Sequence, residues 1–326
     1  MPDSVSCKFR KGSQINMITF LSSTKAFIGQ TAVQQMTAIR SWQALHPDIE
    51  IILYGNSPGT DTACQELRIR HVPNIESTEQ GIPYFGAIAN HADKHARYDV
   101  QVYLNCDILL TPHILKAVEG ITFSHFLMIG QRIDLSEGVD VDVSNPDIIT
   151  ELDELEKAGR ITLHPPAGSD YFVFRRGMWS SLPLIVIGRG GYDNALIAYC
   201  LQRRIPIIDA TLSVLALHQF HDYAHAAGGV KEVFEGGDSM QNLSFVPMNA
   251  IPVLEDANYL LLNNNLSPNK CRKDLLRFNF IKYRYNNVLL IPDVFRILWL
   301  IQIKLGLRHQ WEPTLEEVIS AYQKKQ

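Results

Sequence analysis

The chain has 326 residues and a formal net charge of -4 at pH 7, and this length predicts roughly two domains of about 150 residues or one large α/β domain. Hydrophobic residues (46%) and charged residues (20%) occur in the proportions of a globular protein, which excludes collagen-like, coiled-coil and disordered chains. The negative charge argues against nucleic acid as the partner, because binding to phosphate backbones requires a surplus of Lys and Arg.

The first residues of the chain, 1–14, are polar and are predicted to form a flexible N-terminal segment. No apolar stretch typical of a signal peptide follows them, and no run of about 18 uncharged apolar residues predicts a transmembrane helix. The five cysteines lie far apart without metal-binding spacing, so we expect reduced thiols. Together these features predict a cytoplasmic protein.

Short apolar runs alternate with helical patterns over the first 130 residues. This alternation predicts strand–helix–strand units and a mainly parallel sheet. Strands are expected at 17–22, 50–54, 71–75, 100–110 and 125–130. Helices are expected at 31–45, 62–69, 83–97 and 111–118.

The strand predicted at 100–110 is apolar throughout except for Asn105 and Asp107 near its carboxyl end. Ligands of open α/β sheets bind at that edge. A carboxylate there repels a diphosphate unless a cation lies between the two, and Mg²⁺ and Mn²⁺ favour oxygen ligands. Asp107 is therefore a candidate metal ligand. Asn105 is expected on the same strand face, where its carbonyl oxygen either binds the metal as well or contacts the bound diphosphate ligand. The alternative for Asp107 is a structural aspartate that caps a turn.

An acidic, polar segment at 136–166 predicts a solvated insertion or lid. Regular patterns then resume at 168–175, 193–201 and 205–209. Within this part, the glycine-rich segment 187–194 permits close approach of the backbone to a ligand. Asp193 opens the helical run that follows, where it caps the helix, acts as a general base, or does both. Asp170 is a weaker candidate for holding sugar hydroxyls.

Three histidines lie within eight residues, at His218, His221 and His225. Imidazole is a good ligand for Mn²⁺ and Zn²⁺. His218 is the best candidate ligand, because it closes the strand-like run 212–217. The alternative for each histidine is an ordinary core or surface residue.

The last part of the chain, 241–326, is predicted to be a mostly helical extension with a basic segment at 270–309. Within it, residues 294–307 form an apolar helical stretch that is too short to span a bilayer. Two interpretations stay open: this helix packs on the core, or it lies on an anionic membrane surface. In the second case the protein is peripheral to the inner face of a membrane.

Taken in order, these clusters resemble the glycosyltransferases of the GT-A fold, in the nucleotide-diphospho-sugar transferase superfamily. The segment YLNCDILL resembles their Asp-x-Asp metal motif, GGYDN their later acidic motif, and HQFHDYAH the histidine that completes the metal site. More narrowly, the series GSDYFVF, IGRGGYDNALI, IPIIDAT and HQFHDYAH followed by GG resembles a poorly characterised group of bacterial and algal glycosyltransferase-like proteins. The resemblance covers residues 15–240 and implies a GT-A type, Rossmann-like, mainly parallel central sheet flanked by helices, followed by the helical extension at 241–326.

This resemblance implies transfer of a sugar from a nucleotide-diphospho-sugar donor to a hydroxyl of a glycan, lipid or protein, assisted by Mn²⁺ or Mg²⁺. It assigns Asp107, His218 and His221 to the metal and Asp193 to proton removal. By the same likeness, the nucleotide sugar would be held by Ser22, Thr24, Asn56, Arg132 and Asp134. Asn105, Asp170 and Asn194 complete the set of residues expected to bind it. Asn105 replaces the first Asp of Asp-x-Asp, which leaves Asp107 as the sole carboxylate of that motif.

Three other functions fit parts of the pattern. A metallohydrolase would use His218, His221 and His225, since 221 and 225 have the spacing of a zinc motif, although Asp replaces its Glu. A sugar nucleotidyltransferase would want a Gly- and Arg-rich loop where this chain has SSTKAFIG. A non-catalytic nucleotide-sugar binding protein is compatible with Asn105.

Overall fold

The computed structural model describes residues 17–221, 229–269, 275–286, 288, 291–305 and 312–323. The N-terminal segment predicted at 1–14 and the candidate ligand His225 lie outside the described residues. None of the described helices has the length and hydrophobicity that a bilayer crossing needs.

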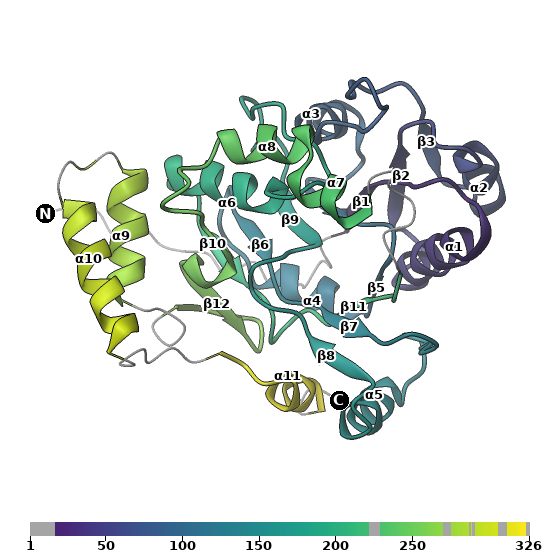
Figure 1. Ribbon diagram of the computed structural model, residues 1–326. Helices are drawn as coiled ribbons and strands as arrows, with labels where there is room; N and C mark the ends of the chain where they lie inside the picture. The colour runs from purple at the N-terminus through teal and green to yellow at the C-terminus, as the bar shows by residue number, and fades with distance from the viewer. Residues whose placement is uncertain are drawn as a thin grey trace, which may run out of the picture.

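A nine-stranded sheet forms the centre of the molecule, in the order β13-β12-β10-β6-β9-β4-β1-β2-β3 (Figure 1). Its strands are β1 (Ile18–Ser23), β2 (Glu50–Tyr54), β3 (Arg70–Val72), β4 (Val100–Leu104), β6 (Leu127–Ile129), β9 (Tyr171–Arg175), β10 (Ile207–Asp209), β12 (Tyr259–Leu262) and β13 (Asn265–Pro268). Neighbours run parallel except at β9, which opposes both β4 and β6, and at the edge hairpin β12–β13. The predicted α/β fold with a mainly parallel sheet is therefore confirmed.

Helices cover both faces of this sheet because the strands are apolar on both sides. On β2, Ile51 and Leu53 join one core while Ile52 and Tyr54 join the other, as the alternation of side chains along a strand requires. The first core is closed by α1 (Gly29–Ala44), α2 (Thr60–Leu67) and α4 (His113–Glu119). The second is closed by α3 (Phe85–His95) and α6 (Tyr192–Gln202), and α8 (Gly237–Ser244) packs against α6.

A small second sheet stands beside the first, in the order β5-β11-β7-β8. It consists of β5 (Ile108–Leu110), β7 (Ile133–Leu135), β8 (Ile161–Leu163) and β11 (Ala216–His218). The prediction of one strand at 100–110 is wrong: the chain leaves β4, turns at residues 105–107, and enters β5 in the other sheet. The turn is held because the Asn105 N–H bonds the Asp170 carbonyl at 3.0 Å and the Ile108 N–H bonds the Asn105 carbonyl at 3.2 Å.

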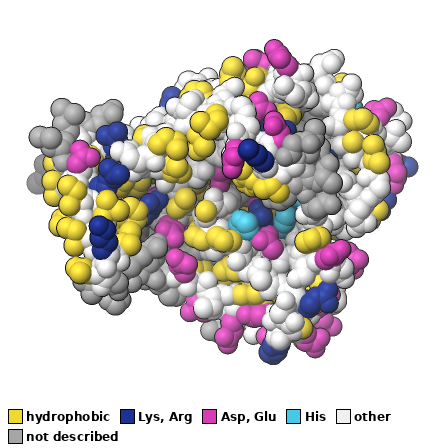
Figure 2. Space-filling model, viewed as in Figure 1, with side chains coloured by type: hydrophobic (Ala, Val, Ile, Leu, Met, Phe, Trp, Pro, Cys, Tyr) yellow, Lys and Arg dark blue, Asp and Glu magenta, His cyan; other side chains and the backbone are white. Residues whose placement is uncertain are grey.

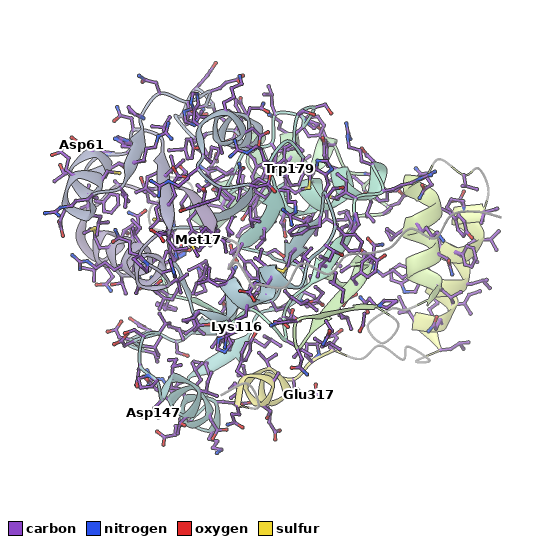
Figure 3. The ribbon with its side chains drawn as sticks, turned by 180° about the vertical axis from the view of Figure 1, so that it is seen from behind. Met17, Asp61, Lys116, Asp147, Trp179 and Glu317 are labelled. Carbon is purple, nitrogen blue, oxygen red and sulfur yellow. The ribbon has the colours of Figure 1, made fainter. Side chains whose placement is uncertain are left out.

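The acidic segment at 136–166 is packed on the core, where the sequence predicted a solvated insertion. It contains β8 and α5 (Ile148–Lys157), whose Ile148, Ile149 and Leu152 are buried. The helix α11 (Leu315–Gln323) lies beside α5, near Asp147 and Glu317 in the view from behind (Figure 3). The acidic residues of α5 are exposed or half-buried beside its apolar stripe, so composition alone hid that stripe.

The remaining elements follow the histidine region. They are α7 (Gly229–Glu235), a 3₁₀ turn at Leu254–Asp256, α9 (Leu275–Tyr285) and α10 (Ile291–Lys304). The central sheet continues past residue 240, the predicted end of the transferase domain, because the apolar run YLLL of β12 pairs in parallel with β10. Beyond β13 the described elements are helical, and α9 with α10 projects from one side of the molecule (Figure 1).

Candidate active site

Three predicted metal ligands meet beside the ends of β4 and β11. Asp107 lies in the turn between β4 and β5, His218 ends β11, and His221 follows three residues later. The strand register fixes His218, because it pairs with Ile108 on β5 and with Asp134 on β7. One ligand atom from each of Asp107, His218 and His221 lies within 4.8 Å of the other two. Histidine side chains are visible next to acidic and basic ones near the middle of this face (Figure 2).

The geometry of this cluster fits a divalent cation. His221 Nε2 lies 3.2 Å from Asp107 Oδ2, and His218 Nε2 lies 3.8 Å from Asp107 Oδ1. Within the described part of the chain, the buried Oδ1 atom of Asp107 accepts no hydrogen bond. Because an unsatisfied buried acceptor costs about 1–3 kcal/mol, a cation at this point would satisfy it. One carboxylate and two imidazoles form a donor set suited to Mn²⁺ and other transition metals.

The two kinds of ligand are held in the charge states that bind metals. Burial acts to raise the pKa of Asp107, but the ammonium of Lys25 and the imidazoles of His221 and His218 outweigh it and hold that pKa well below its usual range. For His218, burial lowers the pKa, and the hydrogen bond to Asp134 opposes this only in part. The cluster therefore offers an ionised carboxylate and a neutral imidazole.

Lys25 places an ammonium group at the same point. Its Nζ lies 3.2 Å from Asp107 Oδ2 and 3.5 Å from His221 Nε2. The backbone of Lys25 is clamped by the buried side chain of Gln35, which accepts from its N–H at 2.7 Å and donates to its carbonyl at 3.0 Å. The loop after β1 thus delivers a positive charge to the candidate metal site.

We expect Lys25→Met to bind Mn²⁺ about tenfold more tightly. Lys25 and a cation at Asp107 carry like charges at close range, and two unit charges about 4 Å apart near a protein surface repel by roughly 4 kcal/mol. Titration of Mn²⁺ followed by electron paramagnetic resonance measures the change. Lys94→Met, on the exposed side of α3, is the matched control and should leave the affinity unaltered. Unchanged or weaker binding in Lys25→Met would mean that the ammonium does not compete with the cation.

A second polar cluster, predicted to hold the nucleotide sugar, adjoins the first. Arg132 Nε donates to Asp134 Oδ1 at 2.7 Å, and its Nη1 forms an ion pair with Asp170. Asn105 donates from its side-chain amide to Asp170 Oδ1 at 2.5 Å. His218 Nδ1 lies 3.3 Å from Asp134 Oδ1, so one imidazole joins both clusters.

Asp134 orients this imidazole. The carboxylate lies between His218 and His164, whose Nδ1 is 2.7 Å from Asp134 Oδ2. Burial acts to raise the pKa of Asp134, but hydrogen bonds from His164 and His218 and the charge of Arg132 hold it below its usual value. A carboxylate bound to the second nitrogen of a ligating imidazole fixes the ring and its tautomer. Asp134 therefore orients His218, the candidate metal ligand.

Asp193 lies in the first turn of α6, two residues after Gly191. Gly191 is the N-cap, with a positive φ of 78°, so Asp193 does not fill the capping role that the sequence left open. Its buried carboxylate accepts from the Ser169 N–H at 3.3 Å, next to Asp170. Burial raises the pKa of Asp193 to about 6, against the opposing hydrogen bonds of Asn194 and Ser169.

The other predicted nucleotide-binding residues lie at three places. Ser22 and Thr24 are at the carboxyl end of β1, where Ser22 donates to the Leu104 carbonyl at 2.7 Å and Thr24 Oγ1 pairs with Thr60 Oγ1 at 2.7 Å. Asn56 is exposed in the loop after β2. Asn194 lies in the first turn of α6, where its side-chain amide donates to the Pro252 carbonyl at 2.8 Å.

No protein-family model matches the chain, and no curated protein sequence matches it. The chain does match solved structures. The chain is similar to TarS of S. aureus at 12% identity, over 63% of this chain and 58% of that one, with a TM-score of 0.37. It is similar to glucosyl-3-phosphoglycerate synthase from Mycobacterium tuberculosis, in complex with Mn²⁺, uridine diphosphate and phosphoglyceric acid, at 16% identity, over 71% and 77% of the chains, with a TM-score of 0.42.

A third similar structure is the mannosyltransferase PcManGT from Pyrobaculum calidifontis, in complex with GDP-Man and Mn²⁺. The identity is 14%, over 59% of this chain and 54% of that one, and the TM-score is 0.35. The chain therefore spans little more than half of the solved TarS chain, residues 1–349, and of the solved mannosyltransferase chain.

Sequence reasoning missed Lys25 and His164. Both are single polar residues without a local motif: Lys25 follows β1, and His164 follows β8. They reach the site only because β1 pairs with β4 and β8 pairs with β7. For Lys25, its position directly after the first strand of a predicted parallel sheet is a usable signal.

Proposed function

We propose that this protein transfers a sugar from a nucleotide-diphospho-sugar donor to a hydroxyl acceptor, with a divalent cation at Asp107, His218 and His221. The observation that carries the proposal is the convergence of these three ligand atoms within 4.8 Å, beside the ends of the parallel strands β1 and β4. Ligands of open α/β sheets bind at that edge. The order of the three motifs in the sequence adds the resemblance to GT-A glycosyltransferases.

The donor set favours Mn²⁺ over Mg²⁺. Mg²⁺ prefers an octahedron of oxygens and keeps several waters, whereas a set with two imidazole nitrogens suits a divalent transition metal. When bound, such a cation supplies positive charge opposite the diphosphate, where negative charge grows during transfer.

The chain's own residues supply the rest of the chemistry. Lys25 and Arg132 add positive charge on the side of the leaving diphosphate. The acceptor oxygen forms a bond to the anomeric carbon, and the bond from that carbon to the phosphate oxygen breaks, leaving its electron pair on the diphosphate. The acceptor proton passes to the Asp193 carboxylate, whose pKa of about 6 suits a general base near neutral pH.

A thermal-shift screen with and without Mn²⁺ tests this proposal. A ligand that binds only the folded state stabilises it, by about 2.7 kcal/mol at a hundredfold excess over its Kd. We expect at least one uridine or guanosine diphosphate species to raise the Tm by several degrees, and only in the presence of Mn²⁺. Nucleoside monophosphates and free sugars are the controls. Equal shifts with Mn²⁺ and with chelator, or no shift with any nucleoside diphosphate, would remove the basis for the proposal.

A further inference from the structure

The helix α10 carries a stripe of apolar side chains that faces away from the protein. Its members recur at the three- and four-residue spacing of one helix face, and each is between 45% and 64% exposed. They are Val294, Ile297, Leu298 and Ile301 of the helix, with Leu305 directly after it. We call this set the outer face of α10.

A different face of α10 holds it to the protein. Phe295 stacks on Tyr283 of α9 at 5.6 Å between ring centroids, and the guanidinium of Arg277 lies 5.4 Å from the centre of the Trp299 ring. The helix α9 is in turn anchored by the buried side chains of Phe280 and Ile281. The outer face is therefore not the face by which the helix packs.

Basic side chains border the outer face. Lys282 and Arg284 are exposed on α9, Lys304 is exposed on α10, and Arg296 is partly exposed. Asp293 is the one acidic side chain in the described residues of these two helices. The whole chain carries a net charge of -4, so the positive charge is local. Apolar and basic side chains lie together on this part of the surface (Figure 2).

We infer that the outer face of α10 docks the protein on an anionic lipid bilayer. Fourteen residues of helix extend about 21 Å, short of the roughly 30 Å of a hydrocarbon core, so the helix lies in the plane of the interface. There the apolar stripe enters the acyl boundary while Lys and Arg reach the headgroups. Negative headgroups complement the basic border, whereas a second copy of this helix would set like charges together. The inference does not depend on the proposed sugar transfer.

Vesicle sedimentation with the full chain tests this docking. We expect binding to phosphatidylcholine vesicles that contain phosphatidylserine and at least about tenfold weaker binding to phosphatidylcholine alone, because each basic residue near an anionic surface contributes about 1 kcal/mol. The double variant Ile297→Glu, Ile301→Glu should lose binding, and its exposed positions make loss of folding unexpected, which circular dichroism checks. Val33→Glu is the matched control, since Val33 is 57% exposed on α1, at the other end of the molecule (Figure 1).

Three outcomes overturn the inference. Equal binding to both kinds of vesicle removes the role of anionic lipid. Full binding by the double variant removes the role of the outer face. A wild-type dimer, seen by analytical ultracentrifugation, that is absent in the double variant assigns this face to a second copy of the chain.

A charge variant, Arg284→Glu with Lys304→Glu, should weaken binding to the phosphatidylserine vesicles without changing the oligomeric state of the protein.

Discussion

In Asp107→Asn, we expect Mn²⁺ affinity to fall at least about a hundredfold and sugar transfer to fall by roughly 10³. The substitution keeps the size of the side chain and removes the only carboxylate of the cluster with His218 and His221. Two imidazoles then remain, without an anionic ligand. Titration of Mn²⁺ by electron paramagnetic resonance measures the first effect, and release of the nucleoside diphosphate measures the second.

The matched control is Asp193→Asn, which neutralises another buried carboxylate near the site that is not a proposed metal ligand. Its Mn²⁺ affinity should equal that of the wild-type protein. Circular dichroism verifies that both variants are folded, because Asp107 also pairs with Lys25 at 3.2 Å. If folded Asp107→Asn bound Mn²⁺ as well as the wild type, the metal assignment would be wrong.

The second large effect is expected in turnover by Asp193→Asn. Loss of a general base reduces the rate by about 10²–10⁴. Binding of Mn²⁺ and of the nucleoside diphosphate should stay intact, because neither is proposed to contact the Asp193 carboxylate. Activity of the wild type should fall as the pH drops through about 6, the value to which burial raises this pKa, since protonation removes the base. The measurement is kcat/KM against pH with the donor found in the thermal-shift screen. Full turnover in the variant, at any pH, would assign proton removal elsewhere.

The pH dependence of the free energy of unfolding tests the pKa of the Asp193 carboxylate independently of activity. Its pKa in the folded protein, about 6, lies above the ordinary value of 3.8, so its contribution to stability is greatest at low pH and is lost as the pH rises through about 6. Relative to Asp193→Asn, the wild type should therefore gain on the order of 1 kcal/mol between about pH 8 and about pH 5. Denaturant unfolding at both pH values measures the difference. A constant difference would mean that the carboxylate is ionised throughout.

Much of the fold followed from the local sequence. The strand predicted at 50–54 has the same bounds as β2. The helices predicted at 31–45 and 193–201 match α1 and α6 to within two residues at each end. These segments are strongly periodic or continuously apolar and end in turn residues, so local preferences and tertiary packing agree. The acidic α5 was missed because its charged residues dominate its composition.

The break between β4 and β5 could not be read from the sequence. Apolar residues continue on both sides of Asn105 and Asp107, and the change of sheet depends on the pairing of β5 with the distant β11. The same pairing brings His218 to Asp107, which the sequence did predict, although from motif resemblance and not from topology. His164 reaches the site only through strand order, which no local pattern records, whereas the position of Lys25 just after the first predicted strand is a local signal.

The most direct test of the metal and diphosphate site is a crystal structure with Mn²⁺ and a nucleoside diphosphate, with data collected at the manganese absorption edge. We predict an anomalous peak among Asp107, His218 and His221, with diphosphate oxygens completing the coordination of the metal. A peak elsewhere, or a diphosphate bound away from the carboxylate of Asp107, would contradict it.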